Sequence, residues 1–119
     1  MGRERKLLGA WGESVAATYL EAHGYRIVQR NWRCIYGEID IVAQQGETLV
    51  FVEVKTRRGG TPEEGVTPQK AERMLTVAQA YLLAHDLDVP WRVDVIAVEL
   101  DRQGKLLRCE HLPGALSAW

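Results

Sequence analysis

The stretch 38–55, EIDIVAQQGETLVFVEVK, constrains the fold of this chain most strongly, because two apolar runs lie on either side of a turn. Isoleucine, valine and phenylalanine dominate these runs and are typical of strands, while Gln45-Gly46 between them supplies the turn. We therefore predict strands over 38–45 and 48–55 that pair as a hairpin.

Charged residues interrupt both predicted strands. Asp40 lies between two isoleucines in the first strand, and Glu53 and Lys55 lie among valines in the second. Because side chains alternate across a strand, Glu53 and Lys55 share one face, as do Glu38 and Asp40. Pairing of the strands can bring these groups to one end of the sheet. Unpaired burial would cost several kcal/mol for each charge, so a metal ion, mutual pairing or water in a cleft should compensate.

The rest of the chain predicts helices and further strands around this hairpin. Leu8, Trp11, Val15 and Tyr19 recur at helical spacing, which places them on the buried stripe of a first helix. The predicted elements are a helix over about 4–23, strands over about 25–32, 38–45 and 48–55, a loop over 56–68, a helix over about 68–86, and strands over 91–100 and 105–112. This order predicts an α/β fold, with a mixed central sheet flanked by helices.

Length and composition narrow the class of protein. The 119 residues suit one domain, 1–119, and 46% apolar residues are enough for a single core. Two distant cysteines imply no disulfide framework. The first residues contain no signal-peptide pattern, and no apolar run approaches the ~18 residues of a membrane span. We therefore expect a cytoplasmic protein with no membrane partner.

The net charge of −1 is not that of an ordinary nucleic-acid-binding domain, which is usually basic. The total hides local cationic clusters, however, and bound metal would offset part of the acidic charge. These clusters are Arg3/Arg5/Lys6, Arg30/Arg33, Arg57/Arg58 and Lys70/Arg73.

Two carboxylates beside a lysine suit a site for Mg²⁺ or Mn²⁺. Mg²⁺ prefers oxygen ligands, takes few of them from protein and leaves room for a substrate phosphate. A lysine such as Lys55 can then orient the attacking water and offset charge on the phosphate. The alternative for Glu53 and Lys55 is a salt bridge at a strand end, worth ~0–1 kcal/mol if exposed. Glu38 could be a further ligand or an acid of the turn after Gly37.

The first helix carries a further acid, Glu13, on the face that holds Ala16, Ala17 and Leu20. This face should pack on the sheet, so Glu13 could reach the charged groups of the hairpin as a third acid; the alternative is an ordinary acid of the helix surface. Gly9 and Gly12 would let the helix approach other backbone closely, at a helix-propensity cost of about 1 kcal/mol each.

Two cations near the hairpin are candidates for phosphate contacts. Arg57 follows Lys55 closely, although it could equally solvate a loop. Lys70 lies in the first turn of the second predicted helix, and helix N-termini attract phosphate.

The run GEID…FVEVKTR, with GAWGE upstream and Lys70 downstream, resembles the bacterial YraN-like family. That family is related to Holliday-junction resolvases within the restriction-endonuclease-like, or PD-(D/E)xK, superfamily. The resemblance covers roughly residues 6–100 and implies an αβββαβ core. The chain departs from the superfamily pattern at Ile39, where a proline is expected.

The resemblance also implies roles for individual residues. Asp40 and Glu53 would be metal ligands, Lys55 the catalytic lysine and Glu13 the acid of the helix. Arg57 and Lys70 would match the arginine after the motif and the lysine that opens the second helix.

The leading expectation is a Mg²⁺- or Mn²⁺-dependent endonuclease that hydrolyses phosphodiester bonds in DNA, including branched or otherwise structured DNA. Symmetric junctions as substrates would favour a homodimer. Two alternatives stay open: a non-catalytic nucleic-acid-binding module that retains the nuclease fold, and a protein-interaction domain.

Overall fold

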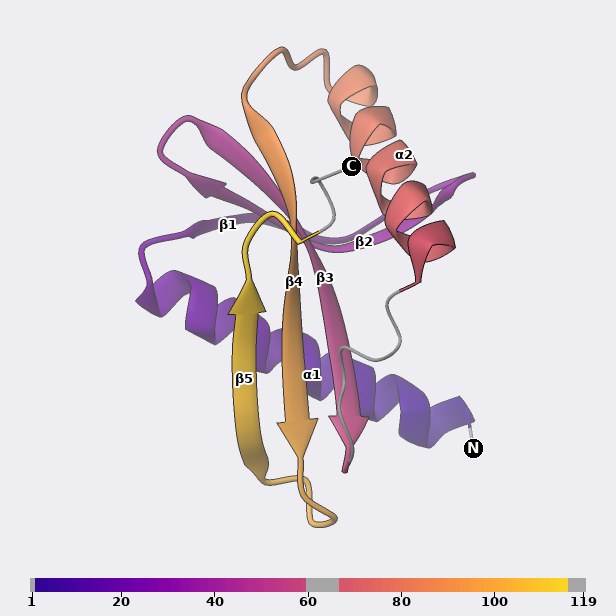
Figure 1. Ribbon diagram of the computed structural model, residues 1–119, viewed down its shortest axis with the longest axis vertical. Coiled ribbons are helices and arrows are strands. Elements are labelled where there is room, and N and C mark those ends of the chain that lie inside the picture. Colours follow the sequence, from indigo (N-terminus) through magenta and orange to yellow (C-terminus); the bar gives the residue numbers. More distant parts are fainter. Residues whose placement is uncertain (1, 60–66, 116–119) are drawn as a thin grey trace.

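The computed structural model describes residues 2–59 and 67–115, with side chains from residue 7 onward, as one mixed sheet and two helices (Figure 1). The elements are α1 (Gly2–Ala22), β1 (Arg26–Cys34), β2 (Gly37–Gln45), β3 (Thr48–Arg58), α2 (Pro68–Ala84), β4 (Trp91–Leu100) and β5 (Leu106–Leu112). Their order confirms the predicted αβββαβ core, followed by one more strand. Strand β3 extends to Arg58, into the predicted loop 56–68, and residues 60–66 of that loop lie outside the described part.

The sheet has the strand order β1-β2-β3-β4-β5. All neighbours pair antiparallel except β3 and β4, which are parallel, so the connection through α2 has to cross over the sheet. The predicted hairpin is confirmed, because Ile41 pairs with Val52 and Gln45 with Thr48. The α/β class with a mixed sheet flanked by helices is therefore as the sequence predicted.

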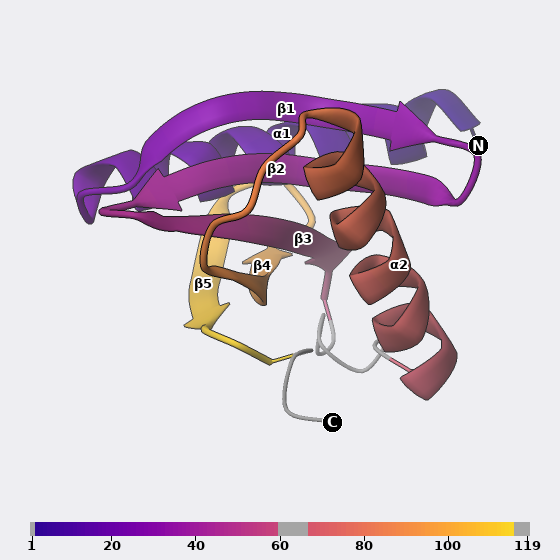
Figure 2. The ribbon, with the colours of Figure 1, turned by 90° about the horizontal axis from the view of Figure 1, so that it is seen from above.

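The two helices cover opposite faces of the sheet, as Figure 2 shows. Strand β3 alternates accordingly: Val50 and Val52 pack with α1, whereas Phe51 packs with α2. Each of these three side chains is fully buried. Burying a residue of this type contributes about 1.5–3 kcal/mol, so the alternating apolar residues of β3 stabilise the packing of one helix on each face of the sheet.

Helix α1 lies close to β3 at Gly12. A Cβ atom on Gly12 would lie 1.8 Å from Thr56 Oγ1, so any side chain there would force the helix away. Gly9 has no atom within 4 Å of such a position, and the predicted close approach at Gly9 is therefore wrong. Trp11 is 51% exposed, not buried as its spacing predicted, because it lies where α1 passes the edge strand β5.

Within the described residues, neither helix combines the length and the apolar character that crossing a membrane requires.

Candidate active site

The site begins where strands β2 and β3 separate. Their pairing runs from Gln45 and Thr48 to Ile41 and Val52. Beyond that point the Asp40 side chain takes the place of a backbone partner, because its Oδ2 accepts a hydrogen bond of 2.7 Å from the Val54 N–H. The strand separation therefore both exposes a backbone donor and supplies the carboxylate that satisfies it.

Three carboxylates converge at this point. Oxygen atoms of Glu13, Glu38 and Asp40 lie within 4.8 Å of one another, and all three residues are half-buried. Helix α1 supplies Glu13 and β2 supplies the other two. The Arg30 Nη2 atom lies 3.6 Å from Glu13 Oε1, and Arg33 Nε lies 2.6 Å from Glu38 Oε2. Across residues 7–59 and 67–115, no comparable ion pair forms with Asp40, so its charge is the least compensated of the three.

Asp40 is the electrostatic centre of this group. Burial, together with the charges of Glu53, Glu13 and Glu38, raises the pKa of its carboxyl to about 8, against the opposing effect of the Val54 hydrogen bond. A carboxyl with such a pKa is costly to ionise unless a cation is present. The donor atoms are all hard oxygens, which are the ligands that Mg²⁺ and Mn²⁺ take.

Glu53 and Lys55 form a half-buried ion pair next to the three acids. Lys55 Nζ lies 3.1 Å from Glu53 Oε1, and the two side chains are only 19% and 20% exposed. Burial lowers the pKa of Lys55, but the charge and hydrogen bond of Glu53 outweigh it, so the net pKa is raised. Lys55 is therefore held as a cation. Glu53 is not one of the three acids within 4.8 Å, although its charge has the largest Coulombic effect on Asp40.

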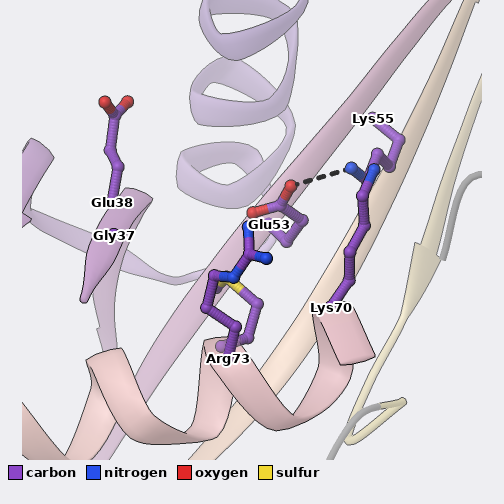
Figure 3. A pocket seen from close by; sticks show the side chains of 7 residues that line it. Gly37, Glu38, Glu53, Lys55, Lys70 and Arg73 are labelled. Atoms are coloured by element: carbon purple, nitrogen blue, oxygen red, sulfur yellow. Dashed lines mark ion pairs between the residues drawn. The ribbon is translucent and has the colours of Figure 1, made fainter. Parts of the chain in front are cut away.

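A cleft of about 270 Å³ opens beside these groups (Figure 3). Its lining comes from the start of β2, from β3 and from the first turns of α2: Gly37, Glu38, Glu53, Lys55, Lys70, Arg73 and Met74. Acidic and cationic side chains thus face one space, which suits a ligand that carries both metal-binding and anionic groups.

The N-terminus of α2 presents cations to the cleft. Thr67 caps the helix, its Oγ1 accepting a hydrogen bond of 3.2 Å from the Lys70 N–H. The Lys70 side chain points toward Lys55, as Figure 3 shows, and the hydrogen bond and charge of Lys55 lower the pKa of Lys70. Arg73 also lines the cleft, a role that sequence reasoning missed. The signal was its position one helical turn after Lys70, on the same face.

The remaining predicted residue, Arg57, lies exposed on β3 two residues beyond Lys55 and does not line the cleft. Its contact with phosphate stays a prediction.

A second charged group, around Asp94, supports the fold. Asp94 is fully buried in β4 and accepts hydrogen bonds from Arg92 Nε at 3.0 Å, His111 Nε2 at 2.7 Å and the Gly114 N–H at 2.8 Å. Burial alone would raise its pKa, but these partners lower it. The group does not line the cleft and ties the end of β5 to the sheet.

Comparison with known proteins places the chain in a family. Residues 12–98 match the model of the Uncharacterised protein family UPF0102. A UPF0102 protein of Roseiflexus castenholzii is 46% identical, covering 98% of this chain and 98% of that protein. One of Arthrobacter sp. is 51% identical, covering 94% of this chain and 98% of that protein.

Among solved structures, SfsA of Pyrococcus furiosus in complex with Ca²⁺ matches with a TM-score of 0.46 and 16% identity, covering 91% of this chain and 64% of that chain. The resemblance to the YraN-like family is confirmed by the sequence relatives, and the chain belongs to the UPF0102 family.

Proposed function

We propose that this protein is a Mg²⁺- or Mn²⁺-dependent endonuclease that hydrolyses phosphodiester bonds in DNA. One observation carries the proposal: the carboxylates of Glu13, Glu38 and Asp40 meet within 4.8 Å beside a cleft that Lys55 and Lys70 line. Metal-assisted phosphodiester hydrolysis needs carboxylates that bind a divalent metal ion and, next to them, cationic side chains that bind the phosphate.

The donor set fits a divalent cation. Asp40 would be the central ligand, because burial and like charges make its ionised form unfavourable without a cation. Glu38 and Glu13 each have a carboxylate oxygen within 4.8 Å of one of its own. Glu53, the second ligand that the sequence predicted, stays a candidate whose carboxylate is also bonded to Lys55.

The cationic side of the cleft would bind the scissile phosphate. When bound, a divalent cation would polarise a phosphate oxygen and lower the pKa of a water molecule. Lys55 is held charged by Glu53, so it would donate hydrogen bonds, orient the water and offset the negative charge that builds on the phosphate. Lys70 and Lys55 repel one another, and an anion between them would relieve that repulsion.

The test is cleavage of linear, nicked and four-way DNA with Mg²⁺ or Mn²⁺. We expect Asp40→Asn and Lys55→Met to lower the rate at saturating DNA by roughly 10²–10³-fold, the usual cost of removing one electrostatic stabiliser. Asp88→Asn is the matched control, because Asp88 is exposed and outside the cleft. Unchanged cleavage in the Asp40 and Lys55 variants would refute the assignment.

The same experiment separates the alternatives. A non-catalytic nucleic-acid-binding module would retain DNA with salt-sensitive affinity but cleave none of the substrates with either metal. A protein-interaction domain would not retain DNA even at low salt. A homodimer and a cytoplasmic location stay predictions, and sedimentation of the protein with and without four-way DNA would test the first.

A further inference from the structure

The tip of the β1–β2 hairpin exposes two large apolar side chains. Ile35 is 91% exposed and Tyr36 is 54% exposed. They form a two-residue connection, because Cys34 and Gly37 on either side are already paired in the sheet. Single exposed apolar residues are common on protein surfaces, but adjacent ones at a projecting tip suggest a contact with another molecule.

The base of this hairpin is fixed at the rim of the candidate cleft. Gly37 lines the cleft, and a Cβ atom on it would lie 3.3 Å from Val77 Cγ2 and 3.6 Å from Arg73 Cδ, so the hairpin packs tightly against α2. Glu38, the next residue, belongs both to the cleft and to the three converging acids. Figure 1 shows the tip, in purple, projecting beyond α2. Ile35 and Tyr36 therefore directly precede, along the chain, residues that line the cleft.

The charges around the tip favour a nucleic acid over an apolar protein partner. Arg33 and Arg30 lie on the same hairpin, where they pair with Glu38 and Glu13, and their side chains are 76% and 37% exposed. Lys70 and Arg73 flank its base across the cleft. Cations can contact phosphates while apolar or aromatic side chains contact the faces of bases, and this pairing of chemistries is typical of proteins that unstack DNA.

We propose that Ile35 and Tyr36 insert against a base next to the phosphate held in the cleft, and that the substrate is DNA whose base stacking is already interrupted. This inference rests on the proposed function of the cleft. Inserting an apolar side chain requires unstacking, which costs least at a nick, a mismatch or a junction. The tip would thus select interrupted duplexes over continuous ones.

The test is binding and base unstacking measured without cleavage. The protein carries Asp40→Asn, and 2-aminopurine is placed beside a nick, beside a mismatch or within an intact duplex. We expect 2-aminopurine fluorescence to rise with the interrupted duplexes. Ile35→Ser with Tyr36→Ala should abolish this rise and weaken binding to them by about 10- to 100-fold, the range of losing one stacked base. Binding to the intact duplex should change little.

Leu83→Ser is the matched control, because Leu83 is 84% exposed and lies near the other end of α2. Equal affinity and fluorescence for the double variant and the control would overturn the inference. So would a change confined to self-association in sedimentation, which would mark the tip as a protein contact.

Failure of the nuclease proposal would look different. The protein could cleave no DNA with either metal while the 2-aminopurine fluorescence still depends on Ile35 and Tyr36. That result would refute the nuclease proposal and support the role of the tip. Cleavage that depends on Asp40, with no effect of the tip on substrate choice or fluorescence, would refute the tip alone. A protein that binds none of the duplexes would overturn both.

Discussion

Replacing Asp40 with asparagine should stabilise the metal-free protein, although it removes a central residue of the site. Asn keeps an oxygen that can accept the Val54 hydrogen bond but carries no charge. The pKa of Asp40 is raised from 3.8 to about 8 in the folded protein. Between those values the unfolded chain loses the proton while the folded protein keeps it, so the free energy of unfolding falls as pH rises.

The magnitude follows from that interval. At 1.36 kcal/mol per pH unit, the full difference between 3.8 and about 8 corresponds to roughly 6 kcal/mol. Neighbouring carboxylates share the titration, so we expect about 2–5 kcal/mol of added stability for Asp40→Asn at pH 8. At pH 5 most of this difference should be absent, because pH 5 lies only about one unit above the unfolded pKa of 3.8, so little of the interval up to about 8 has been crossed.

The assay is urea unfolding of both proteins in chelator at pH 5, 6, 7 and 8. The difference in unfolding free energy should grow by roughly 1 kcal/mol per pH unit. Asp88→Asn, which changes an exposed acid outside the cleft, should show no comparable trend. A difference that does not vary with pH, or an Asp40→Asn protein that is less stable at pH 8, would refute the electrostatic reasoning.

Adding Mn²⁺ should narrow this difference in stability between the wild type and Asp40→Asn. At a hundredfold excess over its dissociation constant, a ligand that binds only the folded state stabilises it by about 2.7 kcal/mol, and the wild type alone should gain this. Because Asp40 must lose its proton to bind the ion, the apparent affinity should weaken by up to about tenfold per pH unit below 8. Calorimetric titration measures this dependence, and equal Mn²⁺ binding by Asp40→Asn would contradict it.

Three further substitutions test other parts of the structure. Gly12→Ala should destabilise the protein by about 1–3 kcal/mol through its clash with Thr56, whereas Gly9→Ala should stabilise α1 by up to about 1 kcal/mol. Thermal unfolding measures both variants, and a gain in stability for both would contradict the close packing at Gly12. Asp94→Ala should cost about 3–5 kcal/mol in urea unfolding because Arg92, His111 and the Gly114 N–H lose the buried carboxylate that they bind. A loss below 1 kcal/mol would show that water replaces the carboxylate. Lys70→Gln should weaken DNA binding in fluorescence anisotropy and lower the salt slope by about 1, and an unchanged slope would remove Lys70 from the phosphate contacts.

The sequence determined the secondary structure and the layers of this protein. The alternation in 38–55 encodes a hairpin with two buried faces, and the structure pairs Ile41 with Val52 as that pattern requires. Helical spacing and the capping position of Thr67 likewise set α1 and α2 locally. These features depend on residues close in the chain, so periodicity and turn chemistry are sufficient to predict them. The expectation that Asp40, Glu53 and Lys55 lie near one end of the sheet follows from pairing the two strands as a hairpin.

Only the tertiary structure decided which groups meet. Alternation predicts the face of a side chain but not where two paired strands separate, and the separation after Ile41 is what places Asp40 against Val54 and near Glu13. The position of α1 depends on its close packing at Gly12. Residue spacing alone could not tell which of the two glycines, Gly9 or Gly12, makes this close approach. Arg73 reaches the cleft only because α2 crosses the sheet beside it. The pKa of Asp40 is set by its burial and by the charges of carboxylates from α1, β2 and β3. It is a tertiary property, because these contributions depend on distances between residues from separate elements.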